Sequence, residues 1–162
     1  MIIEGDNMKR KTFNEKFNDS KDMPKIVIIT DKKVIERYGG KEMLIAPPIE
    51  YSNLMSKVPE GMLITTNEIR KYLADKYDAD FTCPMTAGIF INLAAQASAE
   101  REDNKIPFWR TLKSDGQLNP KYPHAINYQK KMLESEGHNI ITKGRKNIQY
   151  YVEDFEDKIY NL

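Results

Sequence analysis

The chain has 162 residues, with 25 Lys and Arg against 24 Asp and Glu, which suits one domain with a sizeable core. The near-neutral balance excludes a protein that binds polyanions over its whole surface, so any contact with nucleic acid must come from local charge. One cysteine and two histidines exclude an internal disulfide and a cysteine-rich zinc site, and we expect no metal and no cofactor. Because no apolar run reaches membrane length, we expect a cytoplasmic protein without membrane contact.

The N-terminal third predicts an arm followed by a small β-element. Residues 1–23 are polar and predict an arm or a short docking helix. Two runs of strand length, 25–30 and 42–46, are rich in apolar and β-branched residues. A short helix over 31–38 is predicted between them. We therefore place a boundary at residue 47, with an N-terminal unit over 1–47 and the main domain over 48–162.

Helical patterns dominate the next segment. The spacing of apolar residues predicts a short helix over 49–57, and the capping-box pattern at Thr65 predicts a helix over 66–76. Pro84 is suited to the first turn of the following helix. Two helices joined by a short turn predict a helix-turn-helix, with the second as the recognition helix. The apolar stripe expected on that helix consists of Ile89, Phe90, Leu93, Ala94 and Ala97.

The stretch from Ile106 to Leu112 combines a proline with two large aromatic residues. Pro107 disfavours a continuous helix here, so Phe108 and Trp109 are expected on a bend that leads into a brief strand. In one interpretation the rings stack on a planar ligand while nearby cations meet phosphate. In the other both rings are core anchors, as buried aromatics usually are.

The C-terminal part predicts one more helix and a hairpin. A helix over 123–136 would turn Ile126, Met132 and Leu133 inward and stop at Gly137. Residues 138–152 predict a hairpin, and 153–162 a last short helix.

Three motifs in the same order resemble those of the O6-alkylguanine-DNA alkyltransferases, over about residues 49–141. Segment 59–69 is similar to the family's Pro-x-Gly-x-Val-Thr-Thr-Tyr, and segment 131–137 to its Leu-Leu-x-x-Glu-Gly. The family's active-site signature is Ile-Pro-Cys-His-Arg, followed by a glycine turn and a tyrosine. The positions that match it are Ile106, Pro107, Arg110, Gly116 and Tyr122.

The resemblance implies a mostly helical α/β fold: an alkyltransferase-like domain with a helix-turn-helix and short strands, here preceded by the N-terminal β-element. It also implies no enzymatic activity, because Phe108 stands where the family has its nucleophilic cysteine and Trp109 where it has the activating histidine. In the family, the glutamate corresponding to Glu136 orients that histidine. An indole N–H can only donate, so we expect Glu136 to accept a hydrogen bond from Trp109.

Alkyltransferase-like proteins that also lack the cysteine carry a tryptophan in its place and bind alkylated guanine without repairing it. The resemblance therefore implies DNA, with alkylated guanine as the modified base, as the partner. The ligand-pocket residues that it implies are Phe108, Trp109, Arg110, Tyr122 and Glu136. The DNA-binding residues that we expect are Thr65, Thr66, Asn92, Lys113 and Lys121.

Other features of the sequence bear on these expectations in opposite directions. Residues 105–131 contain six Lys or Arg against one Asp, a local excess of five positive charges suited to phosphate. The family's groove-filling arginine and base-pushing tyrosine are missing from 82–86 and 65–67. Two alternatives therefore stay open: a protein-interaction or structural module that reuses the fold with its pocket filled, and an enzyme with another nucleophile. The lone Cys83 is typical of a small buried side chain.

Overall fold

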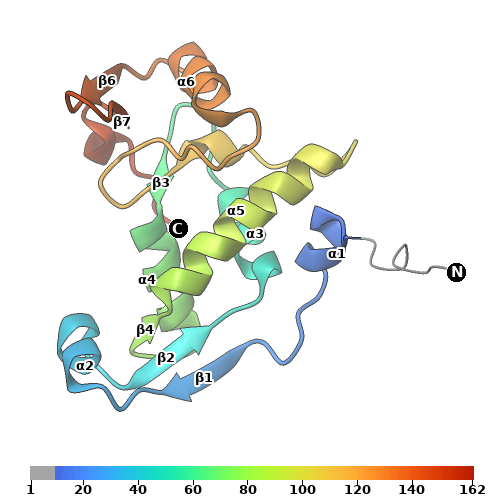
Figure 1. Cartoon of the computed structure of the whole chain (residues 1–162), viewed down its shortest axis with the longest axis vertical. Helices are drawn as coiled ribbons and strands as arrows, with labels where there is room; N and C mark the ends of the chain where they lie inside the picture. Colours follow the sequence, from blue (N-terminus) through green and yellow to red (C-terminus); the bar gives the residue numbers. More distant parts are fainter. Residues whose placement is uncertain (1–9) are drawn as a thin grey trace, which may run out of the picture.

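The larger core of the molecule lies between three helices, α3, α4 and α5, and the short strands beside them (Figure 1). The computed structural model describes residues 10–162, and within that range it is a mixed α/β fold with six α-helices and short strands, as the sequence predicts. In chain order the elements are α1 (Phe13–Phe17), β1 (Lys25–Ile28), α2 (Lys32–Tyr38), β2 (Glu42–Ile45), α3 (Pro48–Met55), β3 (Ile64–Thr65), α4 (Thr66–Lys76), β4 (Phe81–Thr82), α5 (Pro84–Glu100), the 3-10 turn η1 (Phe108–Arg110), β5 (Thr111–Leu112), α6 (Ala125–Ser135), β6 (Ile140–Lys143), β7 (Gln149–Val152) and the 3-10 turn η2 (Phe155–Lys158).

The predicted N-terminal β-element is present and is continuous with the rest of the fold. β1 and β2 pair antiparallel, and α2 between them begins at Asp31, whose carboxylate accepts a hydrogen bond from the N–H of Lys33. β2 pairs in parallel with β4, with Met43 opposite Phe81. The sheet, in the order β1-β2-β4, therefore crosses the boundary that the sequence placed at residue 47.

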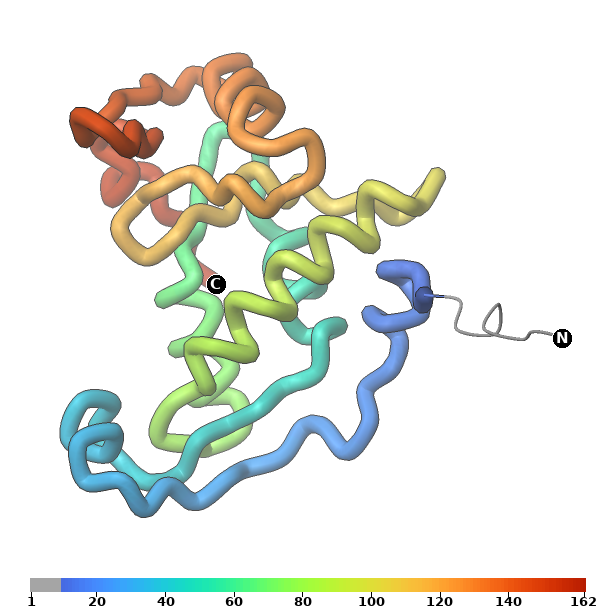
Figure 2. The backbone as a smooth tube through the Cα atoms, in the orientation of Figure 1, coloured from blue at the N-terminus to red at the C-terminus, as the bar shows by residue number. Residues whose placement is uncertain are grey.

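The described part of the N-terminal arm contains the expected docking helix, α1. Figure 2 shows it beside the C-terminal half of α5, and the two helices are in contact. The carboxylate of Glu100, at the end of α5, accepts hydrogen bonds from the N–H groups of Phe13 and Asn14, both at 3.0 Å. These N–H groups begin α1 and have no partner within the helix, so Glu100 satisfies them and fixes α1 to α5. Residues 1–9 of the predicted arm lie outside the described range.

The helix predicted over 66–76 is confirmed as α4, and its start depends on a capping box. The Thr65 hydroxyl accepts a hydrogen bond from the N–H of Asn67, and the carboxylate of Glu68 accepts one from the N–H of Thr65 at 2.6 Å. These bonds satisfy donors that a helix end leaves free. α5 then begins at Pro84 as predicted, and α4 and α5 contact each other. The assignment of this pair as a helix-turn-helix stays a prediction.

The buried face of α5 differs from the predicted stripe. Ala94 and Ala97 are buried as expected, but Ile89 is 54% exposed and Ile91 is buried in its place. Residues two apart on a helix point about 200° away from each other, so both isoleucines cannot face the core. α5 packs against α3 and α1 through the Ile91 side. The opposite side leaves Ile89 and Met85, which is 74% exposed, at the surface.

A smaller second core holds the C-terminal half together. β3 and β5 pair in parallel, with Thr65 opposite Leu112. The predicted helix and hairpin are confirmed as α6 and as the antiparallel pair β6 and β7, and Leu133 of α6 is fully buried. Ile126 packs against this core, whereas Met132 is only half-buried. The buried members of this core are Leu63, Leu112, Leu118, Leu133 and Val152.

The prediction of a last helix over 153–162 is wrong. Only the short turn η2 forms, and the chain then runs extended beside β3, where Ile159 pairs with Leu63. The N–H of Leu63 donates to the carbonyl of Lys158 at 2.9 Å, and the N–H of Tyr160 to the carbonyl of Leu63 at 2.7 Å. The open edge of a short buried strand needs hydrogen-bond partners, and the C-terminal segment supplies them. Among residues 10–162, no helix combines the length and apolar character that a membrane span requires.

We predict that Gly116→Ala destabilises the fold more than Gly137→Ala does. Both glycines have left-handed backbone, with φ of 88° and 92°, so an alanine is strained at either position. A Cβ at Gly116 would also lie 2.3 Å from the Phe155 ring, whereas one at Gly137 meets nothing within 4 Å. The overpacking should cost Gly116→Ala about 1 to 2 kcal/mol more than Gly137→Ala in urea unfolding. Equal losses would contradict this account.

Candidate functional site

A pocket of about 470 Å³ opens beside η1, at the bend that the sequence predicts. Three aromatic rings form its wall: Phe108 and Trp109 from the bend and Tyr128 from α6. The Phe108 and Tyr128 rings lie 5.9 Å apart and are nearly parallel, whereas the Trp109 ring meets both edge-on. Lys105, Arg110 and His124 also line the pocket. A wall of this kind suits a planar ligand, because aromatic faces stack on flat rings.

Phe108 is both a core anchor and part of the pocket wall. Its side chain is buried and its ring contacts that of Tyr122 edge-on, with centroids 5.4 Å apart. The bend itself is held by two backbone hydrogen bonds, from Phe108 N–H to Ile106 and from Arg110 N–H to Pro107. The core-anchor interpretation of the sequence therefore holds for Phe108, and stacking of the rings on a planar ligand stays a prediction.

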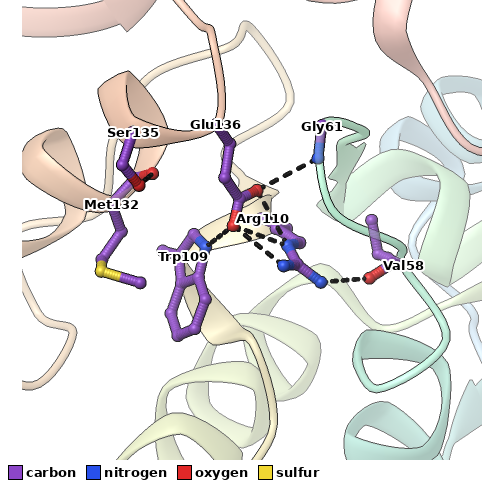
Figure 3. Close-up of polar contacts among 7 residues, drawn as sticks. All are labelled: Val58, Gly61, Trp109, Arg110, Met132, Ser135 and Glu136. Carbon is purple, nitrogen blue, oxygen red and sulfur yellow. Dashed lines mark hydrogen bonds and ion pairs between the residues drawn. The ribbon is translucent and has the colours of Figure 1, made fainter.

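Behind this wall, four donors converge on the carboxylate of Glu136 (Figure 3). The indole N–H of Trp109 donates to Oε2 at 2.8 Å, which confirms the hydrogen bond expected from the sequence. Arg110 donates from Nε to Oε1 and from Nη2 to Oε2, both at 2.9 Å. The N–H of Gly61 completes the set at 3.3 Å, and Nη1 of Arg110 donates to the carbonyl of Val58 at 2.8 Å.

The Arg110–Glu136 pair is buried and neutralised. The Glu136 side chain is 3% exposed and that of Arg110 13%. Burial by itself would raise the pKa of Glu136, but the hydrogen bonds from Arg110, Trp109 and Gly61 outweigh it and hold this pKa below its usual value. Because Glu136 compensates its charge, Arg110 brings little net charge to a ligand in the pocket.

Two of the five predicted pocket residues stand behind the pocket. Tyr122 is buried beneath Phe108, and its hydroxyl donates to the carbonyl of Thr111 at 2.8 Å. Burial raises the pKa of Tyr122, which keeps the phenol neutral. Glu136 faces Trp109 and Arg110 from the side away from the pocket. Neither residue lines the pocket, although the sequence placed both among the ligand-pocket residues, because a sequence motif gives proximity to a site and not which side of a ring each residue occupies.

The predicted DNA-binding residues fall into two neighbouring pairs and one exception. Thr65 is fully buried and its hydroxyl caps α4, so it is not exposed for a contact with DNA. Thr66 and Lys113 each follow one residue of the aligned Thr65–Leu112 pair, so the parallel register sets them beside each other. Both are at least partly exposed.

Asn92 and Lys121 are brought together by Asn119. The side-chain amide of Asn119 donates to Asn92 at 2.7 Å, and its oxygen accepts from the N–H of Lys121 at 2.9 Å. The amide of Gln96 donates to the carbonyl of Lys121 at 2.9 Å, which fixes the loop against α5. Lys121 itself is exposed.

Sequence reasoning missed Tyr128, His124 and Lys105 as pocket residues. His124 and Tyr128 are four residues apart at the start of α6, a spacing that places two side chains on one face of a helix, and their rings lie 5.2 Å apart. That spacing was the one available signal. The lone Cys83 stands at the start of α5, is buried and does not line the pocket. Across residues 10–162, no group of three or more His, Cys, Asp or Glu is placed to hold a metal ion.

Comparison with known proteins gives a likeness in fold. No protein-family model and no curated protein matches the chain. The crystal structure of S. pombe Atl1 in complex with damaged DNA containing O6-carboxymethylguanine aligns with a TM-score of 0.50 and 20% identity, over 71% of this chain and 94% of Atl1. A structure of S. pombe ATL in complex with DNA aligns over the same shares with a TM-score of 0.48 and 18% identity. The chain thus shares the fold of S. pombe Atl1, which agrees with the fold class expected from the sequence.

We predict that Glu136→Gln lowers the free energy of unfolding by about 3 kcal/mol at neutral pH, because Arg110 then keeps a buried charge without a counter-charge. The folded-state pKa of Glu136 is lowered, so its contribution is complete above the ordinary value of 4.5 and is lost as the pH falls through the folded value. The difference in free energy of unfolding between the wild-type protein and Glu136→Gln should therefore become smaller below pH 4.5. Urea unfolding from neutral to acid pH measures it, with Glu134→Gln, an exposed carboxylate on the same helix, as the control. A gap that does not change with pH would contradict this role.

Proposed function

We propose that this chain is a non-enzymatic alkyltransferase-like protein that binds DNA and recognises alkylated guanine in the aromatic pocket. The observation that carries the proposal is the open pocket walled by Phe108, Trp109 and Tyr128 at the bend where the alkyltransferases have their active-site motif. Its volume lies within the range of small-molecule sites, so it suits a purine base with an added alkyl group. The fold is that of S. pombe Atl1, whose structure contains damaged DNA with O6-carboxymethylguanine.

A modified base can enter such a pocket only after it leaves the base stack, and the exposed face of α5 suits that step. Met85 and Ile89 are one helical turn apart and 74% and 54% exposed. Proteins that kink DNA from the minor groove often insert apolar side chains of this kind between base steps. We propose that α5 acts as the recognition helix, with Met85 and Ile89 against the duplex where the family has its arginine.

Phosphate contacts in this proposal come from lysines, since Arg110 is neutralised. Lys113 lies beside Thr66, and Lys121 lies beside Asn92 through Asn119. Neither lysine has an ion-pair partner among residues 10–162. Their charges are thus available to DNA, and binding should weaken steeply with salt.

The chemistry of the site argues against alkyl transfer. Alkyl transfer in the alkyltransferases uses an activated cysteine thiolate, and no cysteine lines this pocket. Cys83 is buried at the start of α5, away from the pocket lining. In this proposal the protein therefore marks or shields the modified base, and other proteins repair it.

A second candidate function is a protein-interaction module. Met85 and Ile89 form an exposed apolar pair, and such pairs also occur at protein interfaces. The neutralised Arg110 and the missing family arginine favour this reading. It predicts no preference for modified DNA, so one titration separates the two functions.

That titration uses two short duplexes of the same sequence, one with O6-methylguanine and one with guanine. Trp109 is the only indole in the chain, so a base stacked in the pocket should quench the protein's tryptophan fluorescence. We expect the modified duplex to bind roughly tenfold more tightly, because a damaged base leaves the base stack at a lower cost in free energy than guanine does. Tyr128→Ala should remove this preference, whereas Tyr151→Ala, in β7 and outside the pocket lining, should keep it. Equal affinity for both duplexes, or no binding at low salt, would favour the protein-interaction module.

A separate prediction concerns alkyl transfer. After incubation with a duplex that contains O6-methylguanine, the intact chain should keep its mass, because no cysteine thiolate lines the pocket. Intact-mass spectrometry with a stoichiometric amount of duplex measures this directly. A mass gain of one methyl group that Cys83→Ser abolishes would show the assignment to be wrong.

A further inference from the structure

A second groove, of about 450 Å³, adjoins the aromatic pocket and has a different character. The two cavities share three lining residues, Ser56, Lys105 and Ile106, so they lie next to each other along this segment. Beyond these residues the groove is lined by Asn53, Asn104 and Arg101, together with Phe17 and Ile49.

Two cations without acidic partners face this groove. The guanidinium of Arg101 donates from Nη1 to the side chain of Asn14 at 2.9 Å and from Nη2 to the carbonyl of Asn104 at 2.8 Å. Lys105 donates from Nζ to the carbonyl of Ser98 at 3.3 Å. In the described part of the chain no carboxylate pairs with either cation, and none lines the groove. Two uncompensated cations in a partly enclosed site favour an anionic ligand.

The N-terminal helix holds Arg101 in place. Asn14 of α1 accepts its hydrogen bond, and the guanidinium lies over the ring of Phe17, 5.6 Å from the centroid. The Nε of Arg101 is buried and has no hydrogen-bond partner in the described part of the chain. Because α1 fixes the guanidinium, little side-chain entropy is lost when it binds an anion.

We infer that this groove selects adducts whose alkyl group ends in an acid, so that the ligand class is an O6-carboxyalkyl guanine rather than a neutral alkyl guanine. The inference rests on the proposed function, which puts the base in the aromatic pocket. The acid then pairs with Arg101 and Lys105 across the shared junction, a contact that a methyl group cannot make. A phosphate of the DNA backbone has the same chemistry as the acid, and the experiment distinguishes the two sources.

The test compares four duplexes of one sequence, with guanine, O6-methylguanine, O6-carboxymethylguanine and its uncharged amide, O6-carbamoylmethylguanine. The acid and the amide have nearly the same size, so their affinity ratio isolates the charge. With the wild-type protein we expect the duplex that carries the acid to bind roughly tenfold more tightly than the duplex that carries the amide, as two partly exposed ion pairs would give. Arg101→Gln should bring this ratio close to one, and Arg101→Lys should retain part of it. Lys32→Gln, which removes an exposed cation on α2, should leave it unchanged.

The outcomes separate the two proposals. If the methylated duplex binds better than guanine but the acid and the amide bind alike, the selection of acids is wrong and the proposed function stands. If the affinity ratio of acid to amide is unchanged in Arg101→Gln, the selection of acids is likewise wrong and the proposed function stands. If Arg101→Gln weakens all four duplexes by one factor, Arg101 contacts a backbone phosphate and the inference is overturned. If no adduct binds better than guanine, both proposals fail together.

Discussion

The buried carboxylate of Glu136 is the contact on which the site depends. It joins three segments that are distant in the sequence: the loop through Gly61, the bend with Trp109 and Arg110, and the end of α6. Trp109 packs against both hydrophobic cores, so this hydrogen-bonded cluster also ties the two halves of the molecule together. A carboxylate this deeply buried is stable only with several donors, and removal of Arg110 would leave its charge uncompensated.

This cluster changes what the pocket can bind. The indole of Trp109 anchors the bend through its N–H, but it supplies no base. The carboxylate that holds Trp109 at the pocket wall also neutralises the charge of Arg110. Recognition in the pocket must therefore come from aromatic surface, and positive charge must come from residues around it, with Lys105 at the junction with the second groove. Lys105 lines both cavities, which suits a ligand that has a flat body and an acidic end.

Predictions that depended on neighbouring residues were confirmed, because caps and turns are local. The capping box at Thr65 fixed the start of α4, and Pro84 fixed that of α5. Predictions about which side of an element faces the core were weaker. Ile89 was expected inside and is exposed, since the faces that α3 and α1 cover decide the orientation of α5. The prediction of a final helix was wrong for a similar reason, because the segment around Ile159 pairs with an open strand edge at Leu63.

By itself the sequence determined the order of most elements, the bend at Pro107 and the hydrogen bond between Trp109 and Glu136. Proline geometry and helix capping act over a few atoms, whatever surrounds them. The bond between Trp109 and Glu136 was expected from the resemblance to the alkyltransferases and from the single donor of an indole. Only the tertiary structure decided that Tyr122 lies behind the pocket while Tyr128 lines it. It also decided that α1 holds Arg101 beside a groove that shares three lining residues with that pocket. Cavities are formed by side chains from distant segments, and their walls depend on packing that no local pattern encodes.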